Sequence, residues 1–305
     1  MAPFGEAVTS VATPEALARA RLRASLVPDL LVEARRVVNT VIAGWHGRRR
    51  RGIGENFWQF RPYVEGEAMS RIDWRRSARD DHTYIRDREW EAAHTVWLWA
   101  DPSPSMLFKS RTAVVSKESR ALVLILALAE LLSRSGERIA WPGLTDPFTA
   151  RNGAERIAAR LAHASSLPSR PELAPVRRFC DIIVVSDFLD PPEEIQQWLG
   201  PLASRGVRAH LVEVADPAEE SFPYSGRTEF RDPESGERLT AGRAETLQQD
   251  YRRLYTARRE ELSLWCKRLG WSLTVNHTDG LASDALVKVH LAMSDDSGDS
   301  RGGAR

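Results

Sequence analysis

A short segment that carries one acid and two hydroxyls, Asp101-Pro102-Ser103-Pro104-Ser105, follows directly on an apolar run at 96–100. Its three polar side chains alternate at the end of a predicted buried strand, so they can turn three oxygens toward one point. Mg²⁺ prefers oxygen ligands and keeps several of its waters, so three such ligands and a partner group suffice to hold it. The two serines could instead satisfy backbone donors in a turn before the next helix. The pentapeptide alone leaves both interpretations open.

A second carboxylate, Asp187, ends the β-branched run at 181–186. From residue 94 onward, strand-like and helix-like patterns alternate, which predicts an α/β fold with a doubly wound, mostly parallel sheet. In such sheets ligands collect at the carboxyl ends of the strands. We therefore expect Asp187 and Asp101 to converge at one edge. The alternative for Asp187 is a cap or turn role before the next helix.

The predicted elements set the frame for that edge. Strands are expected at 95–100, 138–141, 181–187, 206–214 and 271–275. Helices are expected at 116–133, 152–164, 192–204, 244–269 and 281–293, and a hairpin at 229–239.

The composition is that of an ordinary soluble globular protein. Of 305 residues, 42% are hydrophobic and 28% charged, and 43 Lys+Arg against 42 Asp+Glu leave a net charge of +1. No global field therefore attracts nucleic acid or an anionic membrane. Cys180 and Cys266 form no metal-binding spacing or disulfide framework. The N-terminus shows no signal peptide, and the longest apolar run, 121–132, is too short to span a bilayer, so we expect a cytoplasmic protein.

The chain divides into four predicted regions. Residues 1–51 form an N-terminal helical region, with a helix over 14–45 that Pro28 splits into two pieces. Residues 52–93 form a small β-rich segment in which aromatics alternate with arginines and acids. Residues 94–293 form the α/β domain, and the polar, Gly- and Ser-rich residues 294–305 form a disordered tail.

An ordered series of motifs extends from the small β-rich segment into the α/β domain. The motifs are Gly54-x-x-Phe57, Arg61-Pro62-Tyr63-x-x-Gly66-Glu67, Arg71-Ile72-Asp73-Trp74-Arg75-x-Ser77-Ala78-Arg79, Tyr84-x-Arg86 and Asp101-x-Ser103-x-Ser105-Met106. Together they resemble the signature of the bacterial domain-of-unknown-function 58 family, whose members are similar to von Willebrand factor A domains. The chain departs from that signature at Glu67, where the family usually has Asp, and at Ser70, where it usually has Arg.

The resemblance implies a metal-ion-dependent adhesion site. Asp101, Ser103 and Ser105 match its first loop, and Asp187 matches an acid that often acts through water. The pattern also calls for a threonine from a middle loop, for which Thr149 is our candidate and Thr145 the alternative. The implied cofactor is Mg²⁺, or Mn²⁺ or Ca²⁺ in its place.

The resemblance also implies a function. We expect a non-enzymatic interaction module whose cation binds an acidic side chain of a partner. The implied partner is a MoxR-type AAA+ ATPase, and the implied role is chaperone-like complex assembly or maturation. Five motif residues are our candidate partner-binding residues: Arg61, Tyr63, Asp73, Trp74 and Arg79.

Two other functions are kept as alternatives. One is a metal-dependent hydrolase that uses the same carboxylates to activate water. The other is nucleic-acid binding through the arginines at 48–51 and the aromatic segment, against which the interspersed acids and the neutral overall charge argue.

Overall fold

The computed structural model describes residues 14–46, 59–63, 69, 72, 74–79, 82–87 and 94–295. Two compact units are present. The larger comprises Met1–Ile42 and His94–Arg305, and the smaller comprises Ala43–Ala93. The N-terminal helix therefore belongs to the same unit as the α/β domain, although residues 43–93 separate them in the sequence.

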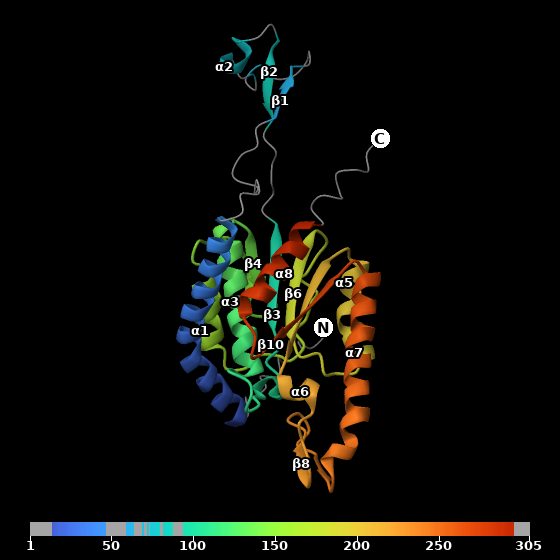
Figure 1. Cartoon of the computed structure of the whole chain (residues 1–305). Coiled ribbons are helices and arrows are strands. Elements are labelled where there is room, and N and C mark those ends of the chain that lie inside the picture. Colours follow the sequence, from blue (N-terminus) through green and yellow to red (C-terminus); the bar gives the residue numbers. More distant parts are fainter. Residues whose placement is uncertain are drawn as a thin grey trace, which may run out of the picture. The chain divides into compact units, whose positions relative to one another are not determined.

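A six-stranded sheet forms the centre of the larger unit, in the order β10-β7-β6-β3-β4-β5 (Figure 1). All neighbouring pairs are parallel except β4 and β5, which are antiparallel. The strands are β3 (Thr95–Ala100), β4 (Arg138–Trp141), β5 (Thr145–Phe148), β6 (Cys180–Ser186), β7 (Arg208–Ala215) and β10 (Ser272–His277). The predicted fold class, α/β with a mostly parallel sheet, is confirmed.

Helices cover both sides of this sheet (Figure 1). On one side α3 (Lys117–Arg134) packs against α4 (Gly153–His163) and α8 (Ala282–Asp295). On the other, α5 (Pro192–Ser204) packs against α7 (Gln248–Arg268). The central strands are buried on both faces, as strands enclosed by two helical layers must be.

Helix α3 lies at the centre of its layer. Its middle is almost wholly apolar, and residues 120–133 are all buried. Ser116 caps the first turn by accepting a hydrogen bond of 3.2 Å from Ser119 N. Just past its end, Gly136 has φ +82°, a backbone conformation that favours glycine. The sequence therefore fixes both ends of the helix that begins at the candidate site.

One prediction of local structure is wrong, and one strand was not predicted. Helix α1 (Pro14–His46) is continuous through Pro28 rather than split. It buries Val27, Ala34 and Val38 on the unit's core, and this packing offsets the hydrogen bond that proline cannot donate. Strand β5 was not predicted, because a four-residue strand that contains Asp146 and Pro147 lacks strand periodicity and is tolerated only at a sheet edge.

Small elements gather beyond the carboxyl ends of the parallel strands. They are the 3₁₀ helix η2 (Pro104–Leu107), helix α6 (Pro217–Ser221), the hairpin of β8 (Thr228–Arg231) and β9 (Arg238–Ala241), and the 3₁₀ helix η3 (Ala244–Leu247). The predicted hairpin is therefore present.

The smaller unit contains an antiparallel pair, β1 (Gln59–Pro62) and β2 (Tyr84–Asp87), and the short helix α2 (Trp74–Ser77). The Ser77 hydroxyl accepts a hydrogen bond of 2.9 Å from Tyr84 N, which ties α2 to β2. The predicted arginine loop at 48–51 and most of the predicted tail, 296–305, lie outside the described residues. Among the helices described in both units, none is long and apolar enough to cross a bilayer.

Candidate functional site

The loop after β3 begins at Asp101, which the neighbouring strand fixes in place. Its backbone N donates to the carbonyl of Val185 in β6 at 2.8 Å. Its carboxylate accepts two hydrogen bonds, from Ser103 N at 2.8 Å and from the Ser186 hydroxyl at 2.6 Å. The ends of β3 and β6 are therefore joined through this one side chain.

The two predicted serines lie together in this loop. Ser103 Oγ and Ser105 Oγ are 3.1 Å apart. Ser103 stands at the cap position of η2, yet its side chain makes no capping hydrogen bond. The turn is instead closed by Asp101, which accepts from Ser103 N. Asp101, Ser103 and Ser105 thus form one group of oxygen-bearing side chains, all half-buried.

The surroundings of Asp101 disfavour the charged form of its carboxyl group. Burial raises the pKa of Asp101 to about 6, against the hydrogen bonds from Ser186 and Ser103, and the nearby Asp187 carboxylate raises this pKa further. The two hydrogen bonds to its carboxylate, from Ser103 N and the Ser186 hydroxyl, come from neutral groups. An added cation at this loop would relieve that cost.

Asp187 follows Ser186 directly but lies in a different environment. It is only 4% exposed, and its Oδ2 accepts a hydrogen bond of 2.8 Å from Lys117 Nζ. The Lys117 side chain is fully buried and also pairs with Glu219. One internal ammonium therefore bridges two internal carboxylates beside the Asp101 loop.

The Lys117 ammonium is held in its charged form. Burial alone would lower the pKa of Lys117, but Asp187 and Glu219 outweigh burial and raise this pKa above its ordinary value. Glu219 is in turn positioned by α6, where it accepts a hydrogen bond of 3.0 Å from Asp216 N in a capping box.

Helix α7 fixes the ends of β6 and β7. Arg258 donates to the backbone carbonyls of Asp187, at 3.2 Å, and Phe188. Phe188 has φ +48°, an uncommon conformation for a non-glycine residue, and these hydrogen bonds help to hold it. The fully buried Glu213 of β7 pairs with both Arg258 and Arg259. The sheet edge next to Asp187 is therefore held together by ion pairs and by hydrogen bonds from arginine to the backbone.

The structure does not bring Thr149 to this edge. Thr149 follows the antiparallel strand β5, whose Phe148 is level with Ile139 of β4 and hence with Val96 near the start of β3. Asp101 follows the far end of β3, about 16 Å away along the strand direction. The alternative, Thr145, accepts a hydrogen bond of 2.9 Å from Trp141 N. Thr149 therefore cannot supply the threonine ligand of the metal site that we predicted.

An acidic residue that we did not predict does reach the loop. Ser105 N donates a hydrogen bond of 3.0 Å to Glu234 Oε1, from the turn between β8 and β9. The candidate site therefore consists of the loop after β3, the acid Asp187 after β6 and the turn of the β8–β9 hairpin.

The family model described as "Protein of unknown function DUF58" matches residues 59–261, a range that contains Asp101, Asp187 and Glu234. The chain belongs to the DUF58 family. It is also 28% identical to the uncharacterized proteins Rv1480 of Mycobacterium tuberculosis and Mb1516 of Mycobacterium bovis, over 84% of this chain and 85% of each relative.

Two solved structures resemble the DUF58 chain weakly. One is the conserved hypothetical protein BatB from Bacteroides thetaiotaomicron, at 17% identity and a TM-score of 0.38, covering 67% of this chain and 99% of that one. The other is an aerotolerance-related membrane protein from Bacteroides fragilis, at 17% identity and a TM-score of 0.36, covering 67% and 100%.

The five candidate partner-binding residues of the DUF58 signature lie in the smaller unit. Arg61 is in β1, and Tyr63 follows it, with its backbone N donating to Thr83 O at 2.7 Å. Trp74 begins α2 and is 64% exposed, and Arg79 is also exposed. Asp73 lies outside the described residues. Trp74 and Arg79 are thus on the surface of their unit, and partner binding by these residues stays a prediction.

Three residues at this site of the DUF58 chain were not predicted from the sequence: Lys117, Glu219 and Glu234. A capping-box pattern, Asp216 followed by Glu219, was readable directly after a buried strand. No comparable signal marks Lys117, because a lysine in the first turn of a helix is ordinarily solvated. Glu234 looked like any acid in a hairpin turn.

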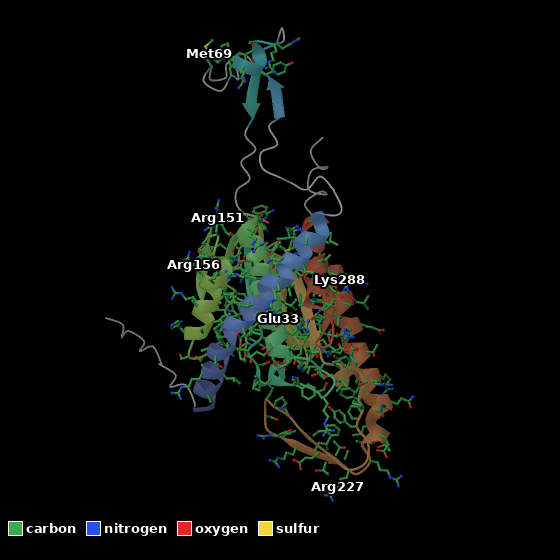
Figure 2. All side chains as sticks on the ribbon, turned by 60° about the vertical axis from the view of Figure 1, so that its left-hand side comes forward. Glu33, Met69, Arg151, Arg156, Arg227 and Lys288 are labelled. Atoms are coloured by element: carbon green, nitrogen blue, oxygen red, sulfur yellow. The ribbon has the colours of Figure 1, made fainter. Side chains whose placement is uncertain are left out.

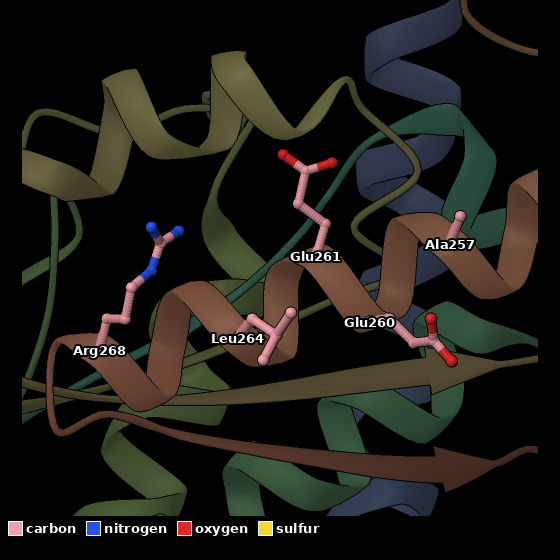
Figure 3. Close-up of a pocket in the computed structure, with 5 residues that line it drawn as sticks. All are labelled: Ala257, Glu260, Glu261, Leu264 and Arg268. Carbon is pink, nitrogen blue, oxygen red and sulfur yellow. The ribbon is translucent and has the colours of Figure 1, made fainter.

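Elsewhere in the larger DUF58 unit, the surface of α7 carries a shallow depression lined by Ala257, Glu260, Glu261, Leu264 and Arg268 (Figure 3). It shares no residue with the candidate site. Across the ranges that the structure describes, no cluster of three or more His, Cys, Asp or Glu side chains is arranged to hold a metal. A cation at this edge would therefore depend on serine hydroxyls as well as carboxylates.

Proposed function

We propose that this DUF58 protein is a non-enzymatic interaction module that binds its partner at the Asp101 loop through a divalent cation. The observation that carries the proposal is the grouping of Asp101, Ser103 and Ser105. Two hydroxyl oxygens 3.1 Å apart lie beside a half-buried carboxylate whose hydrogen bonds come from neutral donors. A cation there would supply the positive charge that the carboxylate lacks.

The donor set fits a hard cation such as Mg²⁺, Mn²⁺ or Ca²⁺, because all three side chains offer oxygen. Asp101, Ser103 and Ser105 would hold the cation. When bound, the cation supplies positive charge and open coordination positions for an external carboxylate. Asp187 contributes negative charge nearby, but its Oδ2 is engaged by Lys117. We therefore assign Asp187 a supporting role rather than that of a direct ligand.

The partner that we propose presents an acidic side chain to this loop. On the sequence resemblance, it is a MoxR-type AAA+ ATPase, and the shared task is assembly or maturation of a complex. Such a contact is selective, because removal of the partner carboxylate leaves a partly desolvated cation without its ligand.

A binding role is favoured over hydrolysis by the state of Asp187. Activation of water at a cation needs a second acid or a histidine that can accept a proton. Two further acids lie at the loop: Asp187 is buried against the Lys117 ammonium, and Glu234 accepts a hydrogen bond from Ser105 N. Asp187 Oδ2 already accepts a hydrogen bond from Lys117 Nζ, so this oxygen is not free to orient a water molecule at the cation.

The test is binding of the purified protein to a purified MoxR-type ATPase from the same organism, with Mg²⁺ and with EDTA. Asp101→Asn removes the charged ligand, and Asp250→Asn, at an exposed site on α7, is the matched control. We expect chelation and Asp101→Asn each to weaken binding by about tenfold or more, in line with the loss of a buried interfacial charge contact. Equal affinity in every case would remove the metal-bridged mechanism.

A further inference from the structure

The β8–β9 hairpin brings an acidic side chain of the same chain to the proposed binding loop. Glu234 lies in the hairpin turn, and its Oε1 accepts a hydrogen bond of 3.0 Å from Ser105 N. A carboxylate is also the group that we propose for the partner. The hairpin therefore offers the expected chemistry of the ligand to the loop that would receive it.

The turn is built to present Glu234 in this position. Asp232 accepts hydrogen bonds of 2.9 Å from Glu234 N, through its side chain, and from Gly236 N, through its backbone carbonyl. Gly236 has φ +75°, which only glycine adopts readily. Asp232 N in turn donates to Glu237 O at 2.8 Å. The turn is thus organised by its own hydrogen bonds, independently of the contact with Ser105.

The strands of the hairpin are anchored to the body of the larger unit. Phe230 of β8 stacks on Phe222 at 5.5 Å and meets Tyr224 edge-on at 5.3 Å. Phe222 also lies against Tyr251 of α7 at 4.6 Å. The hairpin projects below α6 in Figure 1, and Arg227, the residue before β8, is labelled at the outer end of the hairpin in Figure 2. Because these aromatic contacts hold the strands against the larger unit, the turn that carries Glu234 stays close to Ser105.

The contact itself lies at the surface. Glu234 is exposed, and the hydrogen bond to Ser105 N is open to solvent. A hydrogen bond to a charged group is stronger than a neutral one, but exchange with water reduces its net contribution. The carboxylate can therefore leave while the anchored strands stay in place.

We propose that Glu234 is an internal competitor for the acidic ligand, which makes the hairpin turn an autoinhibitory contact. The proposal rests on the proposed function, since it assumes that an external carboxylate binds at this loop. A partner then binds only to molecules in which Glu234 has left Ser105. The measured dissociation constant exceeds the intrinsic one by the inverse of that open fraction.

The first experiment tests the contact in the full chain by amide hydrogen exchange of the segment 101–108. Glu234→Ala removes the acceptor, whereas Glu229→Ala is a matched control in the same hairpin, where the carboxylate pairs with Arg238 at 3.3 Å. We expect faster exchange of this segment in Glu234→Ala and unchanged exchange in the control. Exchange that is unchanged in both variants would overturn the proposal.

The second experiment tests competition with glutarate as an acidic probe, titrated in the presence of Mg²⁺. We expect Glu234→Ala to bind glutarate about fivefold more tightly than the wild-type chain, with Glu229→Ala unchanged. Equal glutarate affinity in the wild-type chain and Glu234→Ala, or no binding by either, would overturn the proposal. Mn²⁺ binding by the wild-type chain is measured separately, so a failure of the cation site is distinguished from a failure of the hairpin mechanism.

Discussion

Two adjacent parts of one sheet edge handle buried negative charge in opposite ways. After β6, Asp187 is paired with the buried ammonium of Lys117, which Glu219 also binds. After β3, Asp101 accepts hydrogen bonds from Ser103 N and the Ser186 hydroxyl, which carry no charge. In the first part the neutralising cation is a side chain of the protein itself, Lys117. The second has oxygen ligands, and the positive charge we propose for it comes from outside.

This difference separates a structural role from a binding role. A carboxylate that is neutralised within the fold has little left to offer a ligand, and loss of its partner is destabilising because a buried charge is left uncompensated. A half-buried carboxylate with neutral donors costs stability and gains most from an added cation. Aspartate therefore has a different role at each of the two strand ends, and the groups that bind its carboxylate determine that role.

The largest expected effect comes from removing the internal cation. Lys117→Met leaves the buried Asp187 and the partly buried Glu219 without their common partner, which we expect to destabilise the fold by about 3–5 kcal/mol. Urea unfolding measures this change. Lys109→Met, on the exposed surface of the loop before α3, is the control and should change stability by less than about 0.5 kcal/mol. A Lys117→Met variant as stable as the control would contradict the assigned structural role.

The matching substitution in the other part should be far milder for the fold. Asp101→Asn keeps an oxygen acceptor and removes no ion-pair partner, so we expect a change in stability of less than about 1 kcal/mol. It should nevertheless abolish binding of Mn²⁺, measured on the same sample. A loss of stability as large as that in Lys117→Met would show that both acids are structural.

The sequence predicts which acids lie at the strand ends of this edge, but not which side chains meet there. The buried strands before Asp101 and Asp187 were readable from their apolar runs, so both acids could be placed at strand ends. Thr149 could not be placed, because the antiparallel strand before it has no strand pattern and reverses the direction of the chain. The Lys117 bridge was not predictable either, since it joins segments 70 positions apart and depends on how α3 packs.

The smallest expected effect lies at the opposite edge of the sheet and depends on pH. His94 Nε2 is 3.1 Å from the buried Asp181 carboxylate, and this contact raises the pKa of His94 above 6.5. The charged pair stabilises the fold below about pH 6.5, and its contribution disappears as pH rises through the raised pKa.

His94→Gln should therefore destabilise the protein by roughly 0.5–1 kcal/mol at pH 6 and by less at pH 8.5, in thermal unfolding at both values. Arg208 also pairs with Asp181, at 2.7 Å, so the carboxylate keeps a cation in the variant. This retained partner distinguishes the pair from Lys117 and keeps the effect small. An equal loss of stability at both pH values would show that protonation of His94 does not contribute.

The most direct test of the account is a Mn²⁺ titration of the full chain followed by electron paramagnetic resonance, which reports free and bound Mn²⁺ separately. We predict that the wild-type protein and Asp250→Asn each bind one ion and that Asp101→Asn binds none while remaining folded. A wild-type protein that binds no Mn²⁺, or an Asp101→Asn variant that binds it equally well, would contradict the claim that this loop is a cation site.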